Sequence, residues 1–126
     1  MLPDLKLFVD TLTSCSGEVA LKYQDLQIDW TPDEPPPTVL LGALGTALIG
    51  SINLLTDTQL DRLSNAIELA MTTNSVVVST GFLEAVLAAA DNNPSAAQFL
   101  AKLGPTAKEY CRAWDRFCGT HSPGIW

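Results

Sequence analysis

The feature that most constrains the fold is Thr38–Ile52, a segment without a charged residue that directly follows three consecutive prolines. At about 1.5 Å per residue it would form a helix of roughly three to four turns. A helix with almost no polar face is stable only when other elements surround it. We therefore predict that Thr38–Ile52 is the central helix and one of the most buried segments.

One side of this helix carries few side-chain atoms, because Gly42, Thr46 and Gly50 follow one another at intervals of four residues. A glycine inside a helix costs about 1 kcal/mol relative to alanine. We expect a neighbouring element to pack closely against this face and to offset that cost.

The composition indicates an acidic protein of one domain, 1–126. Hydrophobic residues make up 47% of the chain, which is enough for a core. The net charge of -7 argues against binding to nucleic acid, which requires an excess of lysine and arginine. The same charge is compatible with docking onto a basic partner.

The start of the chain lacks the basic and apolar regions of a signal peptide. The longest uncharged apolar segments, Thr38–Ile52 and Val76–Leu83, are shorter than the roughly 18 residues that a membrane span needs. Three cysteines without a CxxC motif fit reduced thiols. These observations predict a cytoplasmic protein that does not span a membrane.

An apolar stripe with helical spacing predicts a long first helix. Because the stripe keeps its phase across Ser16, one helix kinked at Gly17 is favoured over two shorter helices. It ends before Pro32, and residues 31–37 form a stiff extended linker. The members of the stripe are Leu5, Phe8, Leu12, Cys15, Val19, Tyr23 and Leu26.

Four helices are expected after the central one. The first starts at a capping box formed by Thr56 and Gln59, the second is capped by Asn74 or Ser75, and the third begins at the Asn-Pro pair 93–94. Their expected bounds are 56–71, 75–90, 94–103 and 105–118. The tail 119–126 has no period and is expected to be irregular.

Two of these helices have clear faces. The first has a water-facing side composed of Asp57, Asp61, Arg62, Asn65 and Glu68. The last has a buried side composed of Ala107, Tyr110, Cys111, Trp114, Phe117 and Cys118. The chain as a whole is predicted to be all-α, a compact bundle of about six helices in hairpins. A small HEAT-like stack is compatible with this pattern, although the chain shows no clear repeat of about 40 residues.

Catalytic chemistry has little support in the sequence. His121 is the only histidine and lies in a tail rich in glycine and proline, which favours an ordinary surface residue. Glu84 would indicate function if it were a buried carboxylate with a raised pKa. The favoured interpretation is that it lies in the narrow solvent-exposed strip of a helix. Since phosphate loops and the GxGxxG and GxSxG motifs are missing as well, we expect no enzyme, no catalytic residue and no cofactor.

A metal site is also not expected. Cys111, Cys118 and His121 have a spacing that matches none of the common zinc patterns, and a zinc site needs four ligands. Small thiols on the apolar face of a helix usually pack in the core. Core packing is therefore the favoured interpretation of both cysteines.

Carboxylates surround Trp30 just before the proline linker. Such a group is either a solvated helix end or a docking edge, in which an aromatic residue among acids contacts a basic partner. On the second interpretation the partner-binding residues are Asp25, Asp29, Trp30, Asp33 and Glu34.

A basic stripe lies at the other end of the chain, on the last helix. Residues 1–50 carry seven acids and two bases, whereas residues 101–126 carry two acids and four bases. The stripe, Lys108, Arg112 and Arg116, is expected to be a solvated face, with binding of an anion or of the acidic N-terminal half as alternatives.

The runs WTPDEPPPTVLLGALGTAL, TGFLEAVLAAA and LGPTAKEYCRAW resemble a group of small, acidic, helical bacterial proteins. Some of them are encoded beside secreted toxins, such as type VI secretion effectors, as immunity proteins. The resemblance runs from Trp30 to Trp114 and assigns no functional residues. It implies an immunity protein that neutralises a cognate toxin. Because the chain starts without a signal peptide, such a toxin is expected to act in the cytosol, and a nuclease is favoured because nuclease clefts are basic.

Two other functions are compatible with the sequence. One is a helical adaptor that binds a partner in the Gly42–Thr46–Gly50 groove. The other is a carrier of a small ligand or lipid, which requires a cavity between the helices.

Overall fold

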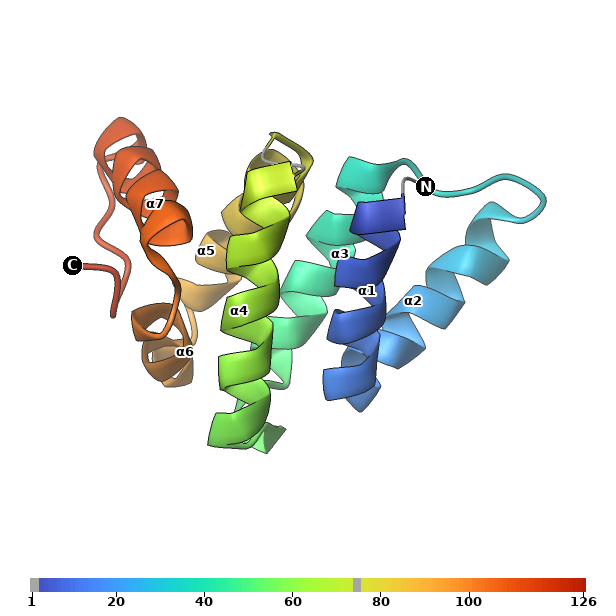
Figure 1. Cartoon of the computed structure of the whole chain (residues 1–126), viewed down its shortest axis with the longest axis horizontal. Helices are drawn as coiled ribbons and strands as arrows, with labels where there is room; N and C mark the ends of the chain where they lie inside the picture. The colour runs from blue at the N-terminus through green and yellow to red at the C-terminus, as the bar shows by residue number, and fades with distance from the viewer. Residues whose placement is uncertain (1–2, 74–75) are drawn as a thin grey trace.

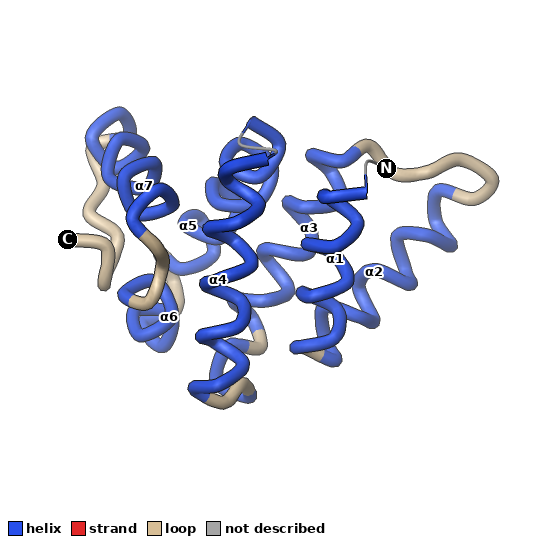
Figure 2. Tube along the Cα trace, in the orientation of Figure 1, coloured by secondary structure: helices blue, strands red, loops and turns tan. Residues whose placement is uncertain are grey.

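The computed structural model describes residues 3–73 and 76–126, which contain seven α-helices and no strand (Figures 1 and 2). The predicted all-α class is confirmed. A π-helix, Val77–Leu83, continues into α5, and short 3₁₀ turns cover Ile52–Leu54 and Pro94–Ala96. The α-helices are α1 (Pro3–Cys15), α2 (Gly17–Trp30), α3 (Pro37–Gly50), α4 (Asp57–Thr73), α5 (Glu84–Ala90), α6 (Ala97–Ala101) and α7 (Pro105–Cys118).

The helices form two layers (Figure 1). One layer contains α1, α4 and α7, and the other contains α2, α3 and the π-helix with α5. The helices lie side by side along the longest axis of the molecule, with α2 at one end and α7 at the other. No helix in the described parts of the chain combines the length and the apolar character that crossing a membrane requires.

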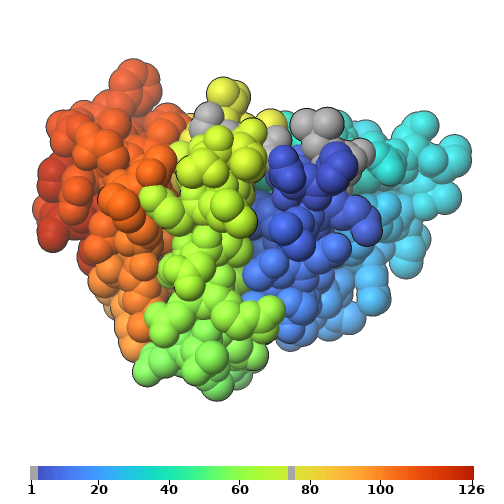
Figure 3. Space-filling model, in the orientation of Figure 1, coloured from blue at the N-terminus to red at the C-terminus, as the bar shows by residue number. Residues whose placement is uncertain are grey.

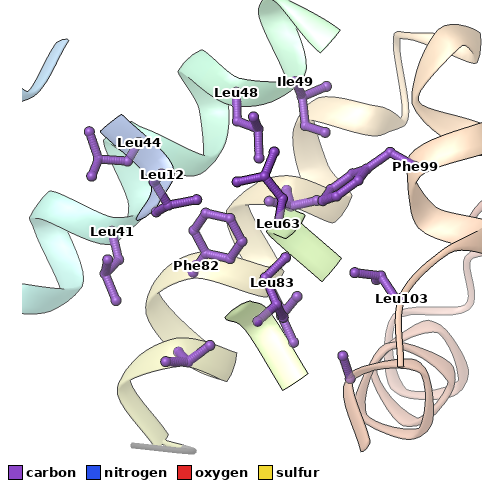
Figure 4. Packing of buried hydrophobic residues seen from close by; sticks show 14 of the residues in the cluster. Leu12, Leu41, Leu44, Leu48, Ile49, Leu63, Phe82, Leu83, Phe99 and Leu103 are labelled. Atoms are coloured by element: carbon purple, nitrogen blue, oxygen red, sulfur yellow. The ribbon is translucent and has the colours of Figure 1, made fainter. Parts of the chain in front are cut away.

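The core confirms α3 as the central helix. Six of its residues are buried, and it packs against α2 on one side and against the π-helix and α5 on the other. Figure 4 shows the α3 side chains meeting Phe82 of the π-helix, Leu12 of α1 and Leu63 of α4. The buried residues of α3 are Leu40, Leu41, Leu44, Gly45, Leu48 and Ile49.

The closely packed face of α3 differs from the predicted one. Thr46 and Gly50 are exposed, and a Cβ added at Gly50 would meet nothing within 4 Å. The close approach occurs at Gly45, where an added Cβ would lie 3.1 Å from the Phe82 carbonyl oxygen. Gly81 returns the contact, since a Cβ there would lie 3.2 Å from the Cα of Thr38. The two backbones can therefore meet because each helix supplies a glycine.

The first predicted helix is in fact two helices, α1 and α2. Ser16 separates them with an extended backbone conformation, φ −136° and ψ 121°, and its Oγ accepts a hydrogen bond from the Val19 N–H at 3.3 Å. An N-cap of this kind starts a new helix. The apolar stripe keeps its phase across the break because α2 folds back onto the same core, with Leu12, Cys15 and Val19 all buried.

Two other predicted helix N-termini lie within the described residues. The capping box is confirmed: the Thr56 N–H donates to Gln59 Oε1 at 2.8 Å, and the Gln59 N–H donates to Thr56 Oγ1 at 3.2 Å. Asn93 is also a cap, and its Oδ1 accepts from the Ser95 N–H. The predicted caps Asn74 and Ser75 lie outside the described residues.

The acidic side of α4 holds the C-terminal third of the chain in place. Gln98 donates to Asp57 at 2.9 Å, and Lys102 donates to Asp61 at 2.9 Å. Glu68 is half-buried rather than water-facing, which corrects the prediction. Its two oxygens accept from the N–H groups of residues 106 and 107, the first turn of α7. Glu68 thus caps α7 from another helix.

Candidate partner-binding surface

The five predicted contact residues lie together at one end of the molecule. We call them the acidic edge: Asp25, Asp29, Trp30, Asp33 and Glu34. The first three belong to the last turns of α2 and the other two to the linker that leads into α3, and all five are exposed. This part of the chain projects from the end of the molecule in Figure 3. Trp30 is 39% exposed, so more than half of its surface is already covered by the protein.

The charges of the acidic edge do not stabilise the helix that carries them. The last turn of α2 contains no basic residue. Asp29 adds its negative charge to the negative end of the helix dipole, which costs on the order of 0.3–1 kcal/mol. Within residues 3–73 and 76–126, no ion pair involves Asp25, Asp29 or Asp33. Their charges are therefore available to a partner.

A cleft of about 320 Å³ adjoins the acidic edge. Its lining combines apolar residues with charges of both signs and the Tyr23 ring. A single side chain of a partner is of a size to enter it. The lining residues are Lys6, Tyr23, Gln27, Glu34, Pro35, Pro37 and Leu40.

A second hollow, of about 210 Å³, lies between α1 and α4. Its lining is mainly apolar, and Leu7 and Leu69 at its rim are exposed. The lining residues are Asp4, Leu7, Phe8, Thr11, Ala66, Leu69, Ala70 and Thr73. A hollow of this size has room for an apolar side chain of a partner.

Glu84 is half-buried and accepts a hydrogen bond from the Tyr110 hydroxyl. Burial, and then this hydrogen bond, raise the pKa of Tyr110 above its usual value. The contact joins α5 to α7. Glu84 lies between the exposed Thr80 and Ala88 on one side of its helix, which agrees with the predicted narrow solvent strip. The hydrogen bond from Tyr110 shows that its carboxylate also has a structural partner.

The two cysteines of α7 have different surroundings. Cys111 is buried, and desolvation followed by the charge of Asp115 raises its pKa to about 12. Cys118 is exposed, which contradicts its predicted place in the core. His121 stacks on Trp126, with ring centroids 5.6 Å apart. The described residues contain no group of three or more histidine, cysteine or acidic side chains that could hold a metal ion.

The basic stripe is partly used by the protein itself. Arg112 Nε donates to the Ile125 carbonyl oxygen at 3.2 Å, and Arg116 lies 3.7 Å from Glu109 and 5.7 Å from the centre of the Trp126 ring. The stripe is therefore not a solvated face along its whole length. Arg112 and Arg116 make these contacts with α7 and the tail rather than with the acidic N-terminal half.

Sequence reasoning missed Asp115, which is only 1% exposed. It accepts hydrogen bonds from Thr120, from the N–H and the hydroxyl of Ser122, and from the Trp126 indole. The irregular tail is thus held tightly against α7, and Ile125 is buried. The available signal was position: Asp115 continues the four-residue spacing of the buried Ala107 and Cys111.

Phe117, by contrast, is 83% exposed, although the prediction placed it in the core. The buried side of α7 includes Asp115 instead of Phe117, because the returning tail covers that side of the helix.

Comparison of the chain with protein families, with curated proteins and with solved structures finds no match.

Proposed function

We propose that this protein acts by binding a basic protein through the acidic edge, and that this partner is a toxin which it neutralises in the cytosol. The observation that carries the proposal is the exposed Trp30 beside three aspartates, Asp25, Asp29 and Asp33, for which residues 3–73 and 76–126 supply no ion pair, at a projecting end of the molecule. An aromatic residue framed by charges is the usual make-up of a binding hot spot.

The physical logic of inhibition requires no chemistry from this chain. A positively charged toxin is drawn to the carboxylates, which speeds association. Trp30 and the neighbouring cleft then supply buried contact, which slows dissociation. A nuclease of the type VI secretion kind is the favoured toxin, because its substrate-binding cleft must attract phosphates and is blocked by an acidic surface.

The second candidate is an adaptor that binds a partner helix. The hollow between α1 and α4 favours it, because two exposed leucines flank an apolar floor there. The Gly42–Thr46–Gly50 face is a poorer site, because its Gly42 end is already covered: a Cβ added there would lie 3.5 Å from the Gly81 carbonyl oxygen.

Co-expression with the product of the neighbouring gene tests the proposal. We expect that product to be toxic alone and harmless with the wild-type protein. Reversal of Asp25, Asp29 and Asp33 to lysine should abolish protection by slowing association. Trp30→Ala should raise the dissociation rate about 30-fold, the equivalent of roughly 2 kcal/mol for a hot spot.

The matched control reverses three acids elsewhere on the surface, Asp10, Asp91 and Glu109, all exposed. It changes the net charge equally and should still protect. A neighbouring product that is harmless to cells lacking this protein would contradict the immunity function and favour the adaptor. Equal rescue by the wild type, the acidic-edge variant and Trp30→Ala would leave inhibition standing and show that another surface makes the contact.

A further inference from the structure

The two helices at the ends of the molecule both expose large apolar side chains. On α2, Leu21 is 56% exposed and Ile28 is 72% exposed. At the opposite end, Phe117 of α7 is 83% exposed and Trp126 of the tail is 51% exposed. Stacked helical proteins usually cover their ends with polar faces, because an apolar end attracts another molecule.

On α2 the apolar side chains share a face with acids. Leu21, Asp25 and Ile28 are spaced by four and three residues, so they lie on the same side of the helix. Asp29 borders this face. Helix α2 contains three acids and one base, and the two acids of the linker follow directly. This end is therefore apolar and negative.

At the α7 end the exposed apolar side chains lie next to bases. Phe117 follows Arg116 and stacks on Trp114, with ring centroids 5.8 Å apart. Arg116 in turn lies over the Trp126 ring. Helix α7 contains three bases and two acids, and one of those acids, Asp115, is buried and faces the tail. The other acid, Glu109, is exposed and lies 3.7 Å from Arg116. The outer surface of this end is therefore apolar, with a small excess of positive charge.

We propose that a second copy of this chain covers these faces, with α2 of one copy packed against α7 of the next. The two surfaces are complementary in charge, and each offers apolar contacts. They lie at opposite ends of the long axis (Figure 1), so the contact is heterologous and leaves one free end of each kind. Such contacts build linear or closed chains of molecules rather than symmetric dimers.

This association is independent of the toxin proposal, although it uses part of the acidic edge. A basic partner with a larger complementary surface would displace the second copy from α2. Because the charges concerned are exposed, self-association should weaken with added salt.

Sedimentation velocity across micromolar to millimolar concentrations tests the inference. At low ionic strength the weight-average mass of the wild type should rise continuously past that of a dimer, and high salt should reverse the rise. Asp25→Lys/Asp29→Lys and Arg116→Glu should each weaken association by about tenfold or more. Phe117→Ser should do the same without a change in charge.

Mixing the two charge-reversed variants gives the decisive measurement. In a head-to-tail chain each variant lacks a partner for its own altered end. In an equimolar mixture, however, both kinds of contact between the two variants pair opposite charges. Association should therefore return in the mixture. A charge-matched control, Asp10→Lys/Asp91→Lys, should associate like the wild type.

Helical circular dichroism and thermal unfolding establish that every variant is folded. A wild type that stays monomeric at millimolar concentration and low salt overturns the inference. So does association that persists in both charge-reversed variants, or a mixture of the two that associates no better than its components. None of these results bears on toxin binding, which is read from co-expression alone.

Discussion

At the scale of single residues, Asp115 shows how a polar side chain is buried without loss of stability. Burial by itself raises the pKa of Asp115, but hydrogen bonds from Ser122, Trp126 and Thr120 outweigh it and hold the pKa below its usual value. Removing the acceptor would strand several donors in the interior, where each unmade hydrogen bond is costly. The residue therefore secures the tail.

Asp115→Asn should lower the free energy of unfolding at neutral pH by on the order of 1–3 kcal/mol. The folded-state pKa of the wild-type carboxyl is depressed, so its contribution is present above the unfolded pKa of about 3.9 and is lost as the pH falls through the folded value. Urea unfolding at a series of pH values should show the difference between variant and wild type shrinking in acid. A constant difference would contradict the assigned role.

Glu68 offers a second test at this scale. Burial raises its pKa, but hydrogen bonds from Thr106 and Ala107 outweigh that effect, and the pKa lies below its usual value. Glu68→Ala removes the cap of α7 and should cost about 1 kcal/mol of stability. Glu109→Ala is the control, because Glu109 is exposed and its ion pair with Arg116 is a surface pair. Equal stability of the two variants in urea would show that the cap is unimportant.

At the scale of elements, the helices that start with a local signal are the ones that the sequence predicts well. Thr56 and Asn93 bond to residues two or three positions away, so their roles follow from the local sequence. Ser16 is the same kind of cap, but the prediction followed the unbroken apolar stripe instead. The stripe reports the common core, and two helices can share one core.

The tightly packed glycine of α3 could not be predicted from spacing alone. Gly42, Gly45 and Gly50 are equivalent in composition, and only the position of the π-helix distinguishes them. That position depends on contacts between residues far apart in the chain.

Gly45→Leu should destabilise the protein by about 1–3 kcal/mol, because the new side chain must displace the Phe82 backbone and the Val86 side chain. Gly50→Ala is the matched control, and it should leave stability unchanged or raise it by up to about 1 kcal/mol. Thermal unfolding followed by circular dichroism measures both. A Gly45→Leu variant as stable as the wild type would contradict the packing of α3.

At the scale of the whole molecule, one hydrophobic cluster extends from Leu5 to Ile125. The exposure of the acidic edge follows from its polar residues and the proline linker, so the sequence predicts it. The cleft beside Glu34 does not follow from the sequence, because α1, α2, the linker and α3 each contribute to it. The identity of a partner depends on a surface that this chain does not contain.

A single core predicts a single unfolding transition. Trp30 reports on one end of the molecule, and Trp114 and Trp126 report on the other. Fluorescence of Trp30→Phe therefore follows the α7 end, and fluorescence of Trp114→Phe/Trp126→Phe follows the α2 end. In each variant, the urea midpoint measured by fluorescence should equal the midpoint measured by circular dichroism. A fluorescence midpoint that differs from the circular dichroism midpoint of the same variant would indicate two independently folding parts.

The uncharged surface of α3 also has a consequence during synthesis. Its main covering, the π-helix and α5, ends at Ala90, 40 residues after α3 ends at Gly50. At translation rates of about 5–20 residues per second, α3 emerges roughly 2–8 s before that covering is complete. For this interval the nascent chain presents an apolar helix to the cell, a feature that chaperones bind. The same residues that centre the finished protein therefore make its unfinished form the most prone to aggregate.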